Sequence, residues 1–216
     1  MKITRVSERG IMLTFSPTRK WDLNLYMIKG EKNDFIIDTG CGGDDSEALV
    51  SFREKAGGEK PVVVINTHFH FDHVWGNRFF GNCTIIAHKE CGRLMRDTKD
   101  EVLKEFGGLI GGREIVEPNV VFDGELDLKS ERLLLFSSPG HSPDGICVYD
   151  YADKVLYAGD NIGDTPAAPV PELMCSKQRY IEALGTMQEK DFSLLLSGHN
   201  VPQDKSFIEK ILSELK

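Results

Sequence analysis

The sequence has few of the features that mark a membrane, secreted or nucleic-acid-binding protein. Its longest apolar runs, such as Pro61–Ile65 and Leu133–Phe136, are much shorter than the roughly 18 residues of a membrane-spanning helix. The first ten residues carry scattered charges and no apolar segment, so we expect no signal peptide. The net charge is −8 and no Lys/Arg cluster is present, which argues against nucleic acid as a partner. We therefore expect neither a membrane nor a nucleic-acid partner.

Paired cysteines and a serine-nucleophile motif are also missing. The five cysteines are widely spaced and form no Cys-x-x-Cys pair, a pattern typical of reduced thiols in the cytoplasm. No Gly-x-Ser-x-Gly occurs, which argues against the nucleophile of a serine hydrolase. The sequence therefore predicts a cytoplasmic protein whose chemistry uses other groups.

What the sequence does contain is an alternation of apolar strands and amphipathic helices over 216 residues, a length that fits one domain, 1–216. Such alternation predicts an α/β protein with helices outside its sheets. Strands are predicted at Trp21–Met27, Phe35–Ile37, Pro61–Ile65, Cys83–Ala87, Arg132–Phe136, Gly145–Tyr149, Lys154–Tyr157 and Phe192–Leu196. Helices are predicted at Asp44–Ala56, in a short segment from His88, at Asp97–Phe106, at Lys177–Lys190, and from a capping box formed by Ser206 and Glu209.

The strongest chemical signal is the segment His68-Phe69-His70-Phe71-Asp72-His73, which directly follows a predicted buried strand. Two histidines spaced two apart at a strand end point to the same side. Asp72 and His73 follow where the backbone must turn, so four side chains that can bind metal converge on a small volume. Imidazole suits zinc and iron, and a carboxylate adds a harder ligand.

Three further strand ends carry the same kinds of side chain. His141 follows Ser138-Pro139-Gly140, Asp160 follows Ala158-Gly159, and His199 follows Ser197-Gly198. Small residues ahead of each side chain allow the backbone to approach closely at a crowded site. Histidine and aspartate at the ends of several strands predict a composite metal site at one edge of a sheet.

The order Asp38-Thr39-Gly40, His-x-His-x-Asp-His, Pro-Gly-His141, Gly-Asp160 and Gly-His199 resembles the metallo-β-lactamase superfamily over nearly the whole chain. The resemblance implies a four-layer αβ/βα sandwich with the active site along one edge, and two divalent metal ions. Zinc is the first choice, with iron or manganese as alternatives. It also implies roles for particular residues: His68, His70 and His141 hold the first metal, Asp72, His73 and His199 hold the second, Asp160 bridges the two together with a hydroxide, and Asp38 orients a ligand histidine.

Two bound metals would polarise the substrate and provide a nucleophile at neutral pH, with Asp72 and Asp160 in catalytic positions and Asp38 supporting them. The main zinc β-lactamase subclass has cysteine at the position of Asp160, which argues against penicillin cleavage. Glyoxalase II shares the ligand set but adds a helical glutathione-binding region, and here the chain ends soon after His199. We therefore predict hydrolysis of a small ester, thioester or lactone by a monomer or a homodimer.

Two alternatives stay open. Persulfide dioxygenases of the same fold bind one iron through the equivalents of His68, His141 and Asp160, so the ligands alone do not exclude oxygen chemistry. A non-catalytic module stabilised by metal is the weaker alternative, because a structural zinc site normally has four protein ligands and no bridging carboxylate.

The remaining features have plainer interpretations. His88 is predicted to be exposed or to cap a helix, and Cys41 to be a small buried residue. Gly107–Gly112 reads as a mobile loop. Leu13–Trp21 and Asn161–Cys175 are predicted loops near the site, where substrate contacts are expected.

Overall fold

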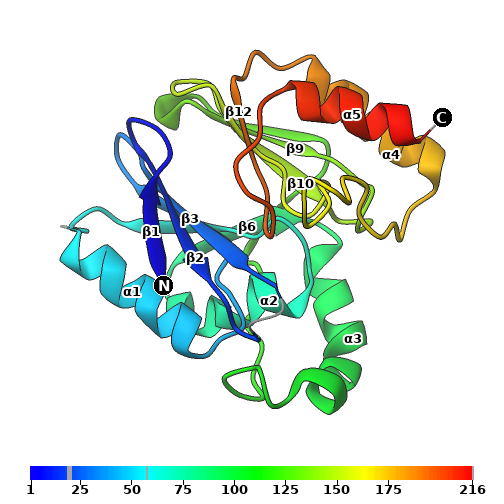
Figure 1. The fold of residues 1–216 in the computed structure, drawn as a ribbon. Coiled ribbons are helices and arrows are strands. Elements are labelled where there is room, and N and C mark those ends of the chain that lie inside the picture. The colour runs from blue at the N-terminus through cyan, green and yellow to red at the C-terminus, as the bar shows by residue number, and fades with distance from the viewer. Residues whose placement is uncertain (19–20, 57, 216) are drawn as a thin grey trace.

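The computed structural model describes residues 1–18, 21–56 and 58–215, in which two β-sheets face each other and helices cover their outer sides (Figure 1). The first sheet has the strand order β1 (Lys2–Arg5), β2 (Gly10–Phe15), β3 (Leu23–Lys29), β4 (Asp34–Ile37), β5 (Val62–Ile65), β6 (Thr84–His88) and β7 (Val120–Phe122). The second has the order β12 (Leu194–Leu196), β11 (Val155–Tyr157), β10 (Ile146–Asp150), β9 (Leu133–Ser137) and β8 (Glu125–Leu128). This is the predicted αβ/βα sandwich.

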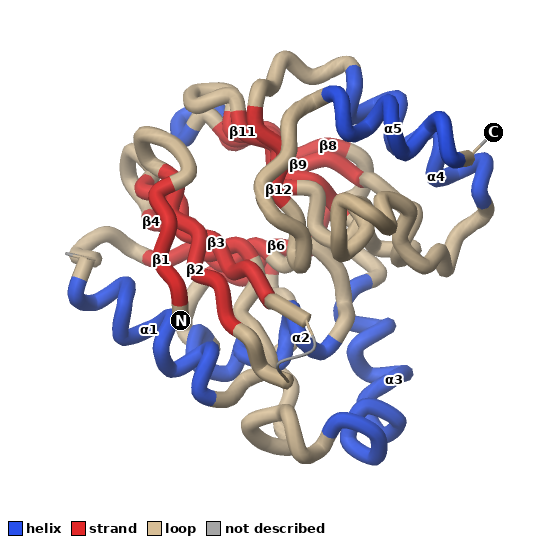
Figure 2. The backbone as a smooth tube through the Cα atoms, viewed as in Figure 1, coloured by secondary structure: helices blue, strands red, loops and turns tan. Residues whose placement is uncertain are grey.

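Helices lie on the far side of each sheet from the other sheet (Figure 2). Those of the first half are α1 (Asp44–Lys55), the short α2 (Phe71–Val74), a 3-10 turn η1 (Trp75–Phe80) and α3 (Cys91–Phe106). Those of the second half are α4 (Lys177–Gln188) and α5 (Ser206–Glu214). A 3-10 turn η2 (Lys129–Glu131) joins β8 to β9, and its Glu131 accepts from the Glu31 backbone N–H in the turn between β3 and β4. None of the described helices is long and apolar enough to cross a membrane.

The inner strands of the second sheet, β9, β10 and β11, are largely apolar on both faces because both faces are covered, whereas the edge strand β8 alternates exposed acidic residues with leucines. In β10, Ile146 and Val148 point into the core between the sheets, whereas Cys147 packs against α4 and α5. Strand side chains alternate with a period of two, so a strand between a sheet and a helical layer needs an uninterrupted apolar run. Burial of each such side chain contributes about 1.5–3 kcal/mol. The runs seen in the sequence therefore reflect the layered architecture.

The structure corrects several predictions about the elements. Cys91–Phe106 forms one long helix, α3, instead of a short helix from His88 and a second helix at Asp97–Phe106, and His88 is the last residue of β6. Strands β1, β2, β7 and β8 were not predicted, and Leu13–Phe15 lies in β2 instead of a loop. Ser206 is the first residue of α5 and forms no capping box. Asp204 caps the helix instead, because its Oδ1 accepts from the Ser206 backbone N–H at 2.8 Å.

Candidate metal centre

The topology brings the predicted site residues to one edge of the sandwich. Strands β4 and β5 are parallel, so Asp38 and the segment from His68 leave the first sheet at the same end. Strands β11 and β12 are parallel, and β9 runs in the same direction because β10 is antiparallel to both β9 and β11. His141, Asp160 and His199 therefore leave the second sheet at one end. A backbone hydrogen bond of 2.9 Å from Ile146 N–H to the Thr67 carbonyl joins the two ends.

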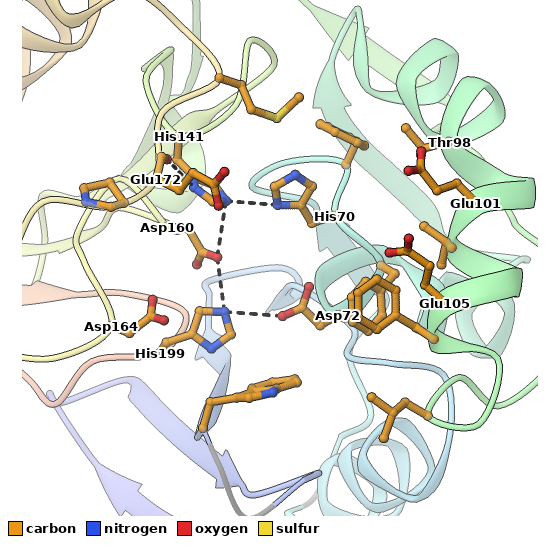
Figure 3. A pocket seen from close by; sticks show the side chains of 18 residues that line it. His70, Asp72, Thr98, Glu101, Glu105, His141, Asp160, Asp164, Glu172 and His199 are labelled. Atoms are coloured by element: carbon orange, nitrogen blue, oxygen red, sulfur yellow. Dashed lines mark hydrogen bonds and ion pairs between the residues drawn. The ribbon is translucent and has the colours of Figure 1, made fainter. Parts of the chain in front are cut away.

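The first group of side chains consists of three imidazoles. His70 Nδ1 lies 3.1 Å from His68 Nε2 and 2.9 Å from His141 Nε2. Figure 3 shows His70 and His141 facing each other across the cavity, one from each half of the chain. The three nitrogens point at one small volume.

The second group consists of Asp72, His73 and His199. Asp72 Oδ2 lies 3.6 Å from His73 Nε2 and 3.3 Å from His199 Nε2. Asp160 adjoins both groups, because its Oδ2 is 3.3 and 3.1 Å from His73 and His199 and 3.7 Å from His68 and His141. All seven predicted ligands thus belong to clusters with the spacing of a metal site.

The spacing of these donor atoms suits coordination of a metal ion better than hydrogen bonding among the side chains themselves. In a tetrahedral zinc site with bonds of about 2.0–2.1 Å, neighbouring ligand atoms lie about 3.3 Å apart, close to the separations in both groups. His73 Nε2 and Asp160 Oδ1 are buried and have no hydrogen-bond partner among the described residues. Buried polar atoms are normally paired, and divalent cations would pair these.

The outward nitrogens of four histidines are held by hydrogen bonds. His73 Nδ1 donates to Asp38 Oδ2 at 2.8 Å. His68 Nδ1 lies 3.1 Å from Thr67 Oγ1, whose hydroxyl donates to the same Asp38 oxygen at 2.7 Å. Asp38 therefore supports one histidine in each group. These contacts keep the proton on Nδ1 and leave the Nε2 lone pair free to bind a metal.

Backbone carbonyls support the other two histidines in the same way. His141 Nδ1 donates to the Glu172 carbonyl at 2.9 Å, and His199 Nδ1 donates to the Asp22 carbonyl at 2.7 Å. Both carbonyls belong to loops that also line the neighbouring cavity. Such contacts come from residues distant in sequence, so no local motif reveals them.

The two groups differ in their electrostatics. Burial lowers the pKa of His68 well below its ordinary value, and the neighbouring His73 lowers it further. Burial and the nearby His141 lower the pKa of His70 to about 4. Both imidazoles are therefore neutral at pH 7, the form that binds a metal.

In the second group the carboxylates outweigh burial. Burial opposes the charged form of His73 and His199, but Asp160 and Asp72 raise the pKa of both histidines well above the ordinary value. Without a cation, protons on these two imidazoles balance the two carboxylates. A divalent cation bound here would displace these protons and balance the two carboxylates in their place.

Gly198 shows how tightly the site is packed. A Cβ at this position would lie 2.2 Å from Asp160 Oδ1 and 2.7 Å from His73 Cε1. Only a residue without a side chain lets β12 pass this close to the two groups.

A cavity of about 720 Å³ opens directly onto the two groups (Figure 3). Its floor includes His70, Asp72 and Asp160, and one wall is the carboxyl-terminal half of α3. The loop Asn161–Cys175 contributes Glu172 and Met174, so this predicted loop lies beside the site, and substrate contacts there stay a prediction. Trp21 lines the cavity from the other predicted loop, and residues 19 and 20 of that loop lie outside the described residues.

Two predictions about single residues have different outcomes. Cys41 is buried, as predicted. His88 is buried, not exposed, at the end of β6, where its Nδ1 accepts from the Glu90 backbone N–H at 3.3 Å. It lies in none of the metal-like clusters among the described residues.

The α3 wall of the cavity was not predicted, since helix packing decides which side chains of α3 reach it.

Known proteins are similar to this chain in sequence and in fold. A family model described as "Metallo-beta-lactamase superfamily" matches residues 20–199. The human protein named acyl-coenzyme A thioesterase MBLAC2 is 28% identical over 74% of this chain, and the match spans 67% of that relative. A Methanocaldococcus jannaschii protein named "Probable metallo-hydrolase" is 32% identical over 84% of this chain and 89% of its own length. The structure of DIM-1 metallo-β-lactamase superposes with a TM-score of 0.77 at 17% identity, over 99% of this chain and 96% of the other, which shows the shared fold.

Proposed function

The chain belongs to the metallo-β-lactamase superfamily and is a metallo-hydrolase, and we propose that it uses two divalent metal ions, zinc first, to hydrolyse a small ester, thioester or lactone. The observation that carries this proposal is the position of Asp160. Its Oδ2 lies within 3.7 Å of imidazole nitrogens from both groups. One carboxylate oxygen between two clusters of ligands supports a bridged pair of metals over a single metal.

Bound metal ions would supply a water of lowered pKa as the nucleophile and would polarise the scissile carbonyl. The protein's own part is to hold the ligands and shape the cavity. Asp38 and Thr67 keep the protons on the Nδ1 atoms of His73 and His68. The side chain of Asp72 lines the cavity and is the group we assign to steer the attacking water and accept its proton.

The relatives support the choice of substrate. A relative named as a thioesterase indicates acyl transfer to water, and the five free cysteines of this chain fit a reducing, cytoplasmic setting. The mononuclear-iron alternative uses only His68, His141 and Asp160. It gives no role to the three-residue group Asp72, His73 and His199, whose donor atoms are just as well arranged.

The test is elemental analysis together with anaerobic kinetics. Protein loaded with zinc or manganese should contain close to two metals per chain. It should also hydrolyse simple thioesters or lactones without oxygen. Protein that holds one iron at saturation and consumes oxygen with a persulfide substrate, with His199→Ala fully active, would establish the dioxygenase instead. Full hydrolytic activity with one metal per chain would refute the two-metal proposal.

A further inference from the structure

The cavity beside the metal groups has a distinct composition. Its walls carry large apolar side chains, among them Trp21, Phe71, Val102, Phe106 and Met174. The rings of Phe71 and Phe106 stack at 4.3 Å, with 17° between their planes, and together form an apolar surface in the cavity wall. This surface fits the hydrocarbon part of an acyl group.

The charged side chains of the cavity, apart from those of the metal groups, all have the same sign. Glu101 and Glu105 reach in from α3, and Asp164 and Glu172 lie on the opposite side (Figure 3). All four residues are exposed, and within the described part of the chain none of the four carboxylates forms an ion pair. No Lys or Arg lines the cavity in the same part of the chain.

A substrate that enters this cavity passes four carboxylates that form no ion pair within the described residues before its carbonyl reaches the floor. Like charges within about 10 Å repel at low ionic strength, and the repulsion is largely screened by salt. An uncharged substrate meets no such barrier, whereas a phosphate or carboxylate close to the scissile bond does.

We propose that this enzyme selects uncharged esters, thioesters or lactones with an apolar acyl group, and that the four carboxylates exclude substrates with anionic groups near the scissile bond. This inference rests on the proposed hydrolase function and narrows it. It separates the chain from its thioesterase relatives, whose named substrate class carries the phosphates of coenzyme A. In the reaction on a thioester, the water oxygen bonds to the acyl carbon, the carbon–sulfur bond breaks, and the thiol leaves with a proton.

A matched pair of substrates tests the proposal. Octanoyl-N-acetylcysteamine and octanoyl-coenzyme A have the same acyl group and the same scissile bond, but only the second carries phosphates. With metal-loaded enzyme at low salt, kcat/KM for the neutral thioester should be higher by at least about tenfold. The ratio should shrink in about 0.5 M salt, where the Debye length falls to a few ångströms.

Variants of α3 identify the source of the selectivity. Glu101→Gln combined with Glu105→Gln should raise the ratio of coenzyme A to neutral thioester kcat/KM by at least about fivefold. The matched control is Asp97→Asn combined with Asp100→Asn, which removes the same charge from the same helix outside the cavity. The control should leave both rates unchanged.

The outcomes separate the two proposals. If neither thioester nor a lactone is hydrolysed by metal-loaded protein, the hydrolase proposal fails. If coenzyme A thioesters react equally well or faster, the hydrolase proposal stands and the selectivity proposal is overturned.

Discussion

Two loops of the second sheet each bury an aspartate, and the pKa values of the two carboxyl groups are shifted in opposite directions. Asp160 follows β11 and Asp144 precedes β10, and both are at most 8% exposed. Burial alone would raise the pKa of Asp160, but the charges of His199 and His73 lower it well below the ordinary range. Burial raises the pKa of Asp144 to about 6, and Ser142 and Cys91 offset only part of the effect.

The difference shows that burial by itself does not identify a functional carboxylate. Burial disfavours the charged form, and only opposite charges or good hydrogen bonds restore it. Asp160 stays an anion because imidazoles surround it, so it is ready to bind cations. Asp144 has no such partners, and both of its oxygens lack a well-formed hydrogen bond among the described residues. It is a structural acid whose charge costs stability.

The largest expected effect comes from removing the charge of Asp160. Asp160→Asn keeps the shape of the side chain but weakens the contact to both groups, so at least one metal should be lost. Hydrolytic kcat/KM should fall on the order of 10³-fold, which corresponds to about 4 kcal/mol of transition-state stabilisation. Metal content and kinetics on one preparation measure both effects.

Asp144→Asn is the matched control, because it makes the same chemical change at a buried aspartate of the same sheet. It should keep both metals and activity within about threefold of the starting protein. Equal losses of metal and activity in the two variants would mean that both aspartates matter for folding alone. The contrast between Asp160 and Asp144 would then be wrong.

A smaller effect is expected from Asp38→Asn, which removes the acceptor shared by His73 and, through Thr67, His68. Loss of such support lowers metal affinity by about 10–100-fold. Competition with a chromophoric chelator measures this affinity. Asp34→Asn is the control, since Asp34 is buried at the start of the same strand but pairs with Arg53 at 3.5 Å, away from the site. Unchanged metal affinity in Asp38→Asn would refute the supporting role.

The sequence predicted the cluster of seven candidate ligands, but it did not predict the groups that support them. The seven residues follow strand ends in recognisable motifs, because close approach at a crowded site requires small residues and a fixed spacing there. Thr67 and the carbonyls of Asp22 and Glu172 left no comparable signal, since any residue supplies a carbonyl. Glu101 and Glu105 looked like ordinary exposed residues of a helix. Only the packing of α3 beside the first sheet places them at the cavity.

The pH dependence of stability sharpens the comparison further. The folded pKa of Asp144, about 6, exceeds the ordinary value of 3.8, so folding favours its protonated form. The stabilisation is fully present below about pH 4 and is lost as pH rises through about 6, and the total loss amounts to about 3 kcal/mol. Asp144→Asn should remove this loss. Urea unfolding at several pH values in the presence of a chelator, which excludes effects of metal release, measures the slope, and parallel curves for both proteins would contradict the assignment.

The smallest effect concerns an aspartate at the surface, where charge matters little and geometry decides. Asp204 Oδ1 accepts from the backbone N–H of Ser206 at 2.8 Å and from its hydroxyl at 2.6 Å, which caps α5. Asp204→Ala leaves that N–H without a protein acceptor, so the melting temperature should fall by about 2–4 °C with metal content and activity unchanged. Asp204→Asn keeps an acceptor oxygen without the charge, and asparagine caps helices about as well as aspartate. Recovery of most of the melting temperature in the Asn variant attributes the effect to the hydrogen bond. A loss equal to that of the Ala variant would attribute it to the charge, and exposed aspartates would then follow the same electrostatic rule as the two buried ones.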